Sequence, residues 1–295
     1  MDIEGSKQSL PRIIFFDLLR IFAIFLVVFV HILQRMKNPL GGFSGIRDFY
    51  YVSLGGIGVT LFLVLSGMAL EYNHGHEKFS YGRFIIERIK RIYPLFWLSI
   101  VISVLLGAKS LPSNFFDFFL MMTGFSAFTG KPWASFTFPT NWFIGLIIPL
   151  YFSYPILSKL IKKHPNTVTL TSLVISVISR FYTGKYWNVP RSTDWFPLCR
   201  LFEFSFGIWL INNENILNFF RKISIKTGQN IITYFSKISF PIFLIHSTVL
   251  EVVSKTVSLE DNFLISIFLF LSGTFLFSNI LFFIDNYIQK KLSKM

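Results

Sequence analysis

The sequence contains one cysteine, Cys199, and few charged residues. A single cysteine cannot form an intrachain disulfide bond, and it excludes zinc sites built from several cysteines. Charged side chains make up 15% of the chain, whereas soluble domains carry about 25%. The five histidines are scattered, and only His74 and His76 form a close pair. We therefore expect no metal site and no disulfide-stabilised fold.

Apolar side chains are abundant instead. They account for 53% of the 295 residues, and phenylalanine alone occurs 38 times. This composition is typical of a polytopic membrane protein, in which most of the chain lies within lipid. The net charge of +13 could attract nucleic acid, but basic loop residues also orient membrane proteins. We favour the second explanation and expect no nucleic-acid partner.

Eight apolar segments are candidates for membrane-spanning helices, which need about 20 residues each. A ninth segment, 115–128, has only about 14 residues and includes Asp117, so we predict a re-entrant or short interfacial piece. The sequence therefore predicts an all-α polytopic membrane protein with a single domain, 1–295. The predicted spans are 13–34, 52–72, 92–108, 141–159, 167–183, 196–211, 238–256 and 263–285.

The basic residues predict how these spans are oriented. With eight crossings, most lysines and arginines fall on one side of the membrane, in segments such as 78–91, 159–163 and 221–237. Cytoplasmic loops carry an excess of lysine and arginine. We therefore predict that both termini are cytoplasmic, with short tails at 1–12 and 286–295. The composition suits a multi-pass protein of the bacterial inner (plasma) membrane, in contact with membrane lipid.

The first predicted span contains three ionisable residues, which are costly inside a bilayer. Arg20 and His31 are 11 residues apart, roughly three full helical turns, so they face the same side of a helix. Asp17 lies three residues before Arg20, close enough to form an ion pair. These residues indicate either a polar cavity between helices or a structural salt bridge with an interfacial histidine.

A strongly basic segment, ERIKRIYPLFW, precedes the third predicted span. Its Arg88 and Arg91 are one helical turn apart, and two guanidinium groups on one face suit bidentate binding of phosphate. The simpler alternative is a basic anchor at the cytoplasmic surface. We interpret the segment as a loop, with Pro94 near the first turn of the next helix.

Other polar residues in the predicted spans allow more than one interpretation. Ser66 is either a hydrogen-bonding group or a small residue at a helix contact. Arg200 and Glu203 are three residues apart and could simply neutralise each other. His246 is either a second cavity group or a buried histidine with satisfied hydrogen bonds.

Taken in order, these motifs resemble those of membrane-bound acyltransferase family 3, whose members are polytopic O-acyltransferases that modify cell-surface and secreted glycans. The resemblance covers nearly the whole chain. The chain departs from the family pattern at Ile147, a glutamate in many relatives, at Phe240 and Phe243, which replace tyrosines, and by lacking a membrane segment near 212–236. The matching motifs are Arg20 followed by ten residues and His31, FLVLSG, Arg88–x–x–Arg91, NWFIGLIIPLYFSYPIL, LFEFSFG and SFPIFLIH.

This resemblance implies an acyl-CoA donor, most often acetyl-CoA, that arrives from the cytoplasm. We expect Arg88 and Arg91 to hold the phosphates of CoA. Ser66 would be a supporting hydrogen-bonding group. No metal cofactor is implied.

The resemblance also implies a glycan or glycolipid acceptor, whose sugar hydroxyl receives the acyl group. We expect His31 to act as the general base on this hydroxyl, because it lies toward the outer half of the first span. Arg20 and Asp17 would shape the electrostatic field around the reacting groups.

Two hypotheses from other functional classes compete with the enzyme. A transporter or flippase could use Asp17, Arg20 and His31 as a substrate or proton path. A non-catalytic membrane partner in a glycan-assembly complex is the third possibility. Of the three hypotheses, only the acyltransferase hypothesis predicts that the protein binds and consumes a thioester.

Overall fold

The computed structural model describes residues 11–35, 54–75, 80–129, 140–187, 192–223, 225, 227–257 and 262–292. Within these ranges the chain is helical and contains no β-strand, which confirms the predicted all-α class. The helices are α1 (Ile14–Arg35), α3 (Leu54–His74), α4 (Tyr81–Leu105), α5 (Phe115–Thr123), α6 (Asn141–Lys163), α7 (Pro165–Tyr186), α8 (Ser192–Trp195), α9 (Leu201–Asn212), α10 (Glu214–Lys222), α11 (Gln229–Thr256) and α12 (Phe263–Leu292), with 3₁₀ turns η1 (Ser126–Thr129) and η2 (Pro197–Arg200).

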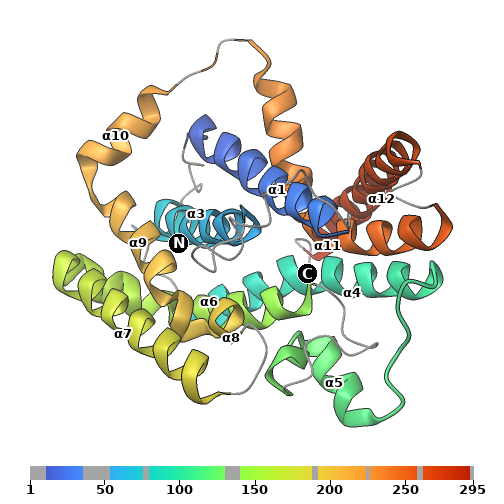
Figure 1. The fold of residues 1–295 in the computed structure, drawn as a ribbon. Helices are drawn as coiled ribbons and strands as arrows, with labels where there is room; N and C mark the ends of the chain where they lie inside the picture. Colours follow the sequence, from blue (N-terminus) through green and yellow to red (C-terminus); the bar gives the residue numbers. More distant parts are fainter. Residues whose placement is uncertain are drawn as a thin grey trace.

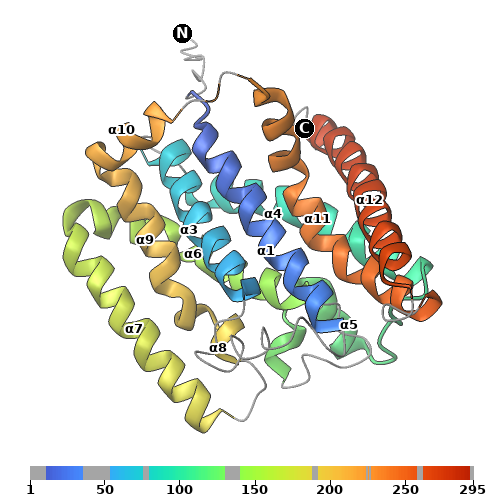
Figure 2. The same ribbon diagram turned by 45° about the horizontal axis from the view of Figure 1, so that its top comes forward.

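The helices α1 and α3 lie side by side at the centre of the bundle (Figures 1 and 2). Helix α3 packs most extensively on α1 and α9, and α11 packs on both α12 and α1. Helices α6, α7 and α9 form one side, whereas α4 contacts α11 and α12 on the other. The start of α1 and the end of α12 lie at the same end of the bundle, opposite α5 and α8 (Figure 2).

The contact between α3 and α9 depends on two glycines. A side chain at Gly67 would collide with the carbonyl oxygen of Phe204, and one at Gly207 would collide with that of Val64. Small residues allow membrane helices to approach this closely, because van der Waals packing drives their association. The two glycines therefore set how closely these helices pack.

We expect Gly207→Ala to separate α3 from α9 and to destabilise the protein by about 1–3 kcal/mol, the usual cost of overpacking. Gly82→Ala is the matched control, because nothing lies within 4 Å of a Cβ at Gly82. It should leave stability unchanged or slightly higher, since alanine favours helix over glycine. Thermal unfolding of both purified variants in detergent tests this, and equal midpoints would contradict it.

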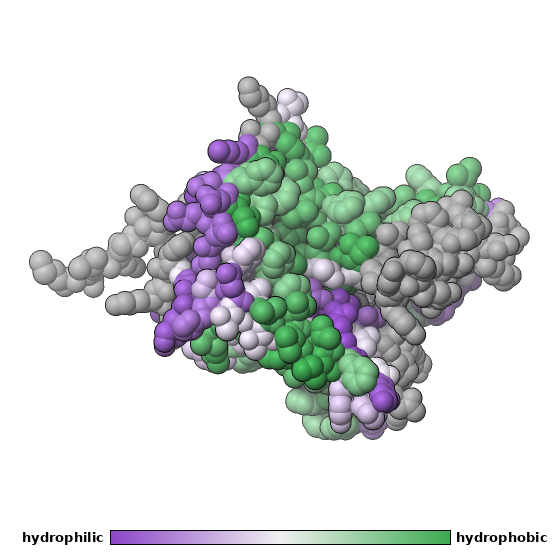
Figure 3. All heavy atoms as spheres, turned by 60° about the vertical axis from the view of Figure 1, so that its left-hand side comes forward, coloured by the Kyte–Doolittle hydropathy of each residue, from purple (hydrophilic) through white to green (hydrophobic). Residues whose placement is uncertain are grey.

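Large apolar side chains cover the outer surface of the bundle. Leu170 and Phe181 on α7 are 62% and 64% exposed, and Leu264 and Phe268 on α12 are 80% and 69% exposed. Figure 3 shows broad apolar areas bounded at one edge by hydrophilic residues. Soluble proteins rarely expose contiguous apolar surface of this extent, so these faces are suited to lipid.

Among the residues that the structure describes, five helices are long and apolar enough to cross a membrane: α1, α3, α6, α11 and α12. The other predicted spans fall in α4, α7 and α9, which do not combine that length with that hydropathy. Helix α9 has 12 residues and a rise of about 18 Å, against a hydrocarbon core of about 30 Å. The described helices thus indicate a multi-pass membrane protein, while eight crossings and cytoplasmic termini remain predictions.

Several boundaries differ from those predicted. Segment 115–128 forms the nine-residue helix α5 and the turn η1, which is the short piece expected. Asn114 caps α5 by accepting a hydrogen bond from the backbone N–H of Asp117. The predicted basic tail 286–295 is helical as far as Leu292, because α12 continues beyond the apolar residues. An additional amphipathic helix, α10, lies in the segment where relatives are expected to have a membrane helix.

Candidate functional site

One face of α1 carries two of the predicted site residues, Arg20 and His31. Arg20, Ile24, Val27 and His31 follow the spacing of a helical face, and the two apolar residues between the polar ones are buried. The rise of a helix separates Arg20 from His31 by about 16 Å along the axis. The predicted common orientation of Arg20 and His31 therefore agrees with the packing of α1, with an apolar layer between them.

Asp17 is 1% exposed and accepts several hydrogen bonds. Arg12 donates through Nε at 2.6 Å and Nη2 at 2.9 Å, and Ser236 of α11 donates at 2.6 Å. The predicted ion pair with Arg20 is present but is the longest of these contacts, at 3.4 Å. Asp17 therefore joins α11 and the segment before α1, and it only partly neutralises Arg20.

Arg88 and Arg91 lie within helix α4, which begins at Tyr81, so the interpretation of this segment as a loop is wrong. Pro94 is correspondingly inside the helix rather than in its first turn. A proline removes one helical hydrogen bond, but neighbouring helices can satisfy the freed group in a membrane bundle. The helical geometry fixes the two guanidinium groups one turn apart, as the spacing suggested.

Arg88 is half-buried and holds its guanidinium 5.5 Å from the ring centroid of Phe84. The Phe84 ring in turn lies 5.3 Å from that of Tyr154 on α6. The Nε atom of Arg88 is buried without a hydrogen-bond partner, and no ion pair joins Arg88 to any residue in the described ranges. Burial lowers the pKa of Arg88, an effect that Tyr151 opposes, yet the group stays charged at neutral pH.

The structure brings the predicted donor-binding cations together. Arg20 and Arg88 each interact electrostatically with Arg91. Tyr151 of α6 interacts with both Arg20 and Arg88, and Asp285 of α12 interacts with Arg91. We call Arg20, Arg88 and Arg91 the arginine cluster; it gathers side chains from α1 and α4 and concentrates positive charge.

His31 lies apart from the arginine cluster and contacts His246 of α11 instead, with ring centroids 5.1 Å apart. His246 is 1% exposed, and its Nδ1 lies 3.1 Å and 2.8 Å from the carbonyl oxygens of Ile242 and Phe243. Because carbonyls only accept, Nδ1 carries the hydrogen, and Nε2 can accept from the Ser247 hydroxyl at 3.0 Å. His246 is thus both a satisfied buried histidine and the neighbour of His31.

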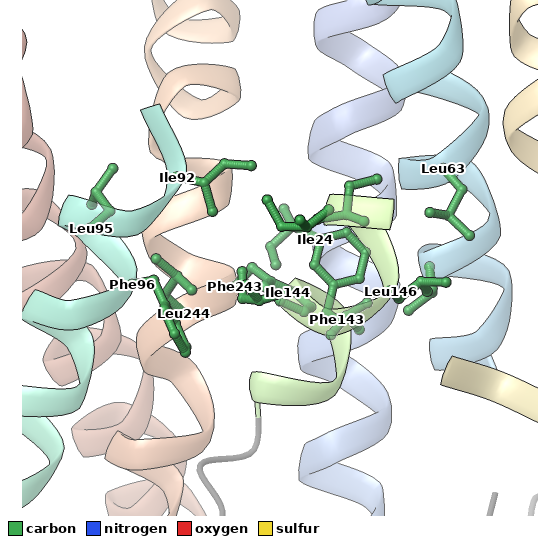
Figure 4. Packing of buried hydrophobic residues seen from close by; sticks show 14 of the residues in the cluster. Ile24, Leu63, Ile92, Leu95, Phe96, Phe143, Ile144, Leu146, Phe243 and Leu244 are labelled. Carbon is green, nitrogen blue, oxygen red and sulfur yellow. The ribbon is translucent and has the colours of Figure 1, made fainter. Parts of the chain in front are cut away.

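An apolar layer separates the histidine pair from the arginine cluster. Figure 4 shows Ile24 of α1 beside Phe143 of α6 and Phe243 of α11, and all three belong to the main hydrophobic core. The rings of Phe143 and Phe243 are 4.8 Å apart, and Phe62 of α3 contacts Phe243 at 6.1 Å. In this conformation, therefore, buried apolar side chains lie between Arg20 and His31 along α1.

Ser66 is half-buried, one turn after Phe62 on α3. No contact in the described part of the chain links it to Arg88 or Arg91, so its supporting role remains a prediction. The glutamate of many relatives is replaced by Ile147, which is 2% exposed and lies in the apolar core.

Arg200 and Glu203 form the ion pair that their spacing suggested, at 3.1 Å. Arg180 of α7 also donates to Glu203 at 2.7 Å, and Arg200 pairs with Asp194 of α8 at 3.3 Å. Arg200 further donates to the Thr60 hydroxyl at 3.2 Å. This network ties α3, α7, α8 and α9 together and neutralises its own charges.

No group of three or more histidine, cysteine, aspartate or glutamate side chains with metal-binding geometry occurs among the residues that the structure describes. His74 packs at the edge of the Phe84 ring, at 5.6 Å, whereas His76 lies outside the described residues. The expectation of no metal therefore stays a prediction.

A comparison with protein families identifies the family of the chain. The acyltransferase domain of acyltransferase family 3 matches residues 13–226, which include the arginine cluster and His31. The chain belongs to acyltransferase family 3. No curated protein and no solved structure matches the chain.

Membership of acyltransferase family 3 confirms the family suggested by the sequence motifs. It supports acyltransferase activity and does not favour the transporter or flippase. The match ends before α11, so it does not cover His246. The individual roles of the site residues remain predictions.

Proposed function

We propose that the protein is an integral membrane O-acyltransferase of the bacterial plasma membrane. It moves an acetyl group from cytoplasmic acetyl-CoA to a hydroxyl of a cell-surface or lipid-linked glycan. The observation that carries this proposal is the arginine cluster of Arg20, Arg88 and Arg91, located in a chain of an acyltransferase family. A concentration of guanidinium groups is suited to the phosphates of CoA.

Arg88 fits a phosphate ligand best among the three arginines. Asp17 partly balances Arg20, Asp285 interacts with Arg91, and Glu87 interacts with Arg88. Arg88 differs from the other two because its Nε atom is buried without a partner. An unsatisfied buried donor on a cation is costly unless an acceptor joins it. A phosphate oxygen would satisfy this atom and would compensate the charge.

His31 would act at the other end of the site, as general base. Its imidazole would remove the proton of the acceptor hydroxyl while that oxygen attacks the thioester carbonyl carbon. The carbon–sulfur bond then breaks, and the proton passes from His31 to the departing thiolate of CoA. With the phosphates at Arg88, the pantetheine arm would have to cover the distance to His31.

This distance includes the apolar layer of Ile24, Phe143 and Phe243. The thioester can reach His31 along this direction only if these side chains move apart.

The test is transfer of radiolabelled acetyl from acetyl-CoA in membranes that contain the full-length protein. We expect label in the isolated envelope glycan only when the protein is present. Acetyl-CoA binding to the purified protein provides a second measurement that does not require the acceptor. A protein that neither binds nor consumes acetyl-CoA would contradict the proposal.

A further inference from the structure

Tyr151 of α6 lies where three helices of the candidate site converge. It is half-buried, and its ring centroid is 6.2 Å from that of Phe204 on α9. The residue interacts electrostatically with Arg20 of α1 and with Arg88 of α4. No sequence spacing relates Tyr151 to these arginines, because only tertiary packing brings the helices together.

The aromatic contacts of Arg88 place Tyr151 independently. Arg88 lies over Phe84, and Phe84 contacts Tyr154 at 5.3 Å. Tyr154 is three residues after Tyr151, so the two tyrosines lie on neighbouring positions of one face of α6. The side of α6 that faces Arg88 therefore includes Tyr151.

The Tyr151 hydroxyl forms no hydrogen bond with the residues that the structure describes. Other tyrosines of the bundle are satisfied: Tyr154 donates to the Leu70 carbonyl at 3.1 Å, and Tyr93 donates to the Thr123 carbonyl at 3.0 Å. The Arg88 Nε is buried without a partner, whereas the Tyr151 hydroxyl belongs to a half-buried side chain and is not fully buried. An accessible donor with no protein partner in the described ranges is available to a ligand.

We propose that the Tyr151 hydroxyl belongs to the donor site and donates a hydrogen bond to the phosphate group held by Arg20 and Arg88. This inference rests on the proposed function, because it assigns a further residue to the same donor site. A phosphate offers more acceptor positions than one guanidinium can occupy, so a neutral donor adds to the binding of the anion without adding charge.

Tyr151→Phe removes the hydroxyl and keeps the ring that packs on Phe204. We expect this variant, as full-length protein in detergent, to bind CoA about tenfold more weakly than the wild type, the effect of one hydrogen bond to a charged group. Its thermal unfolding should be unchanged, because the lost hydroxyl has no hydrogen-bond partner in the described part of the chain. Binding of pantetheine, which lacks phosphate, should be equal in the two proteins.

Tyr93→Phe is the matched control, because its hydroxyl donates to a protein carbonyl and not to a ligand. It should lower thermal stability and leave CoA binding unchanged. If the wild type binds CoA and Tyr151→Phe binds it equally well, the inference is wrong while the proposed function stands. If the wild type binds neither CoA nor acetyl-CoA, the proposed function itself fails.

Discussion

Replacing His31 by alanine should lower acetyl transfer about 10²- to 10⁴-fold, the usual contribution of a general base. The imidazole contacts His246 at the end of α1 that lies away from the arginine cluster. Binding of CoA should be unchanged, because about 16 Å of helix separates His31 from Arg20. When both are measured on the same preparation, the transfer rate should therefore fall while the affinity for CoA stays the same.

The control for His31→Ala is His164→Ala. His164 is exposed between α6 and α7, so its loss should leave both transfer and CoA binding intact. Transfer at nearly the wild-type rate in His31→Ala would contradict the general-base role. Parallel loss of transfer and of CoA binding would instead indicate that His31 supports the packing of α1 against α11.

The sequence was sufficient to predict the helical class, the multi-pass character and the common face of Arg20 and His31. These features depend on apolar composition and on the period of the helix, which act locally. The pairing of Arg200 with Glu203 was predicted for the same reason, since three residues form nearly one turn. The positions of α5 and of the N-terminal part of α1 also followed from local apolar patterns.

Contacts between distant helices could not be predicted in this way. The convergence of Arg20, Arg88 and Tyr151 and the contact of His31 with His246 join residues far apart in sequence. Glu71 was also missed, although a carboxylate within a predicted span is itself a signal. It is 1% exposed and pairs with Lys162 of α6 at 3.0 Å, a partner that only the folded bundle supplies.

The start of α4 differs from the prediction because a cluster of charged residues does not by itself end a helix. Residues such as Glu87, Arg88 and Lys90 favour helix in water as strongly as many apolar residues do. The start of the apolar segment therefore does not coincide with the start of the helix. Helix α4 continues for several turns before the apolar segment that starts near residue 92.

Arg88→Ala should weaken CoA binding about 10- to 150-fold, the range expected when a charged hydrogen-bonding group is lost. Arg88→Lys should restore only part of the affinity, because an ammonium group cannot form the bidentate contact of a guanidinium. Arg91→Ala should have a smaller effect, since Arg91 is exposed and interacts with Asp285. Titration of the purified variants with CoA measures all three.

Arg83→Ala is the control that separates specific binding from general attraction of an anion. Arg83 lies on the same helix and is exposed, about 140° around the helix axis from Arg88. If the protein merely attracts CoA through its net charge, Arg83→Ala and Arg88→Ala should weaken binding equally, and salt should abolish both effects. If the half-buried Arg88 contacts a phosphate directly, its loss should dominate and should persist at high salt, because buried charges are screened less than exposed ones.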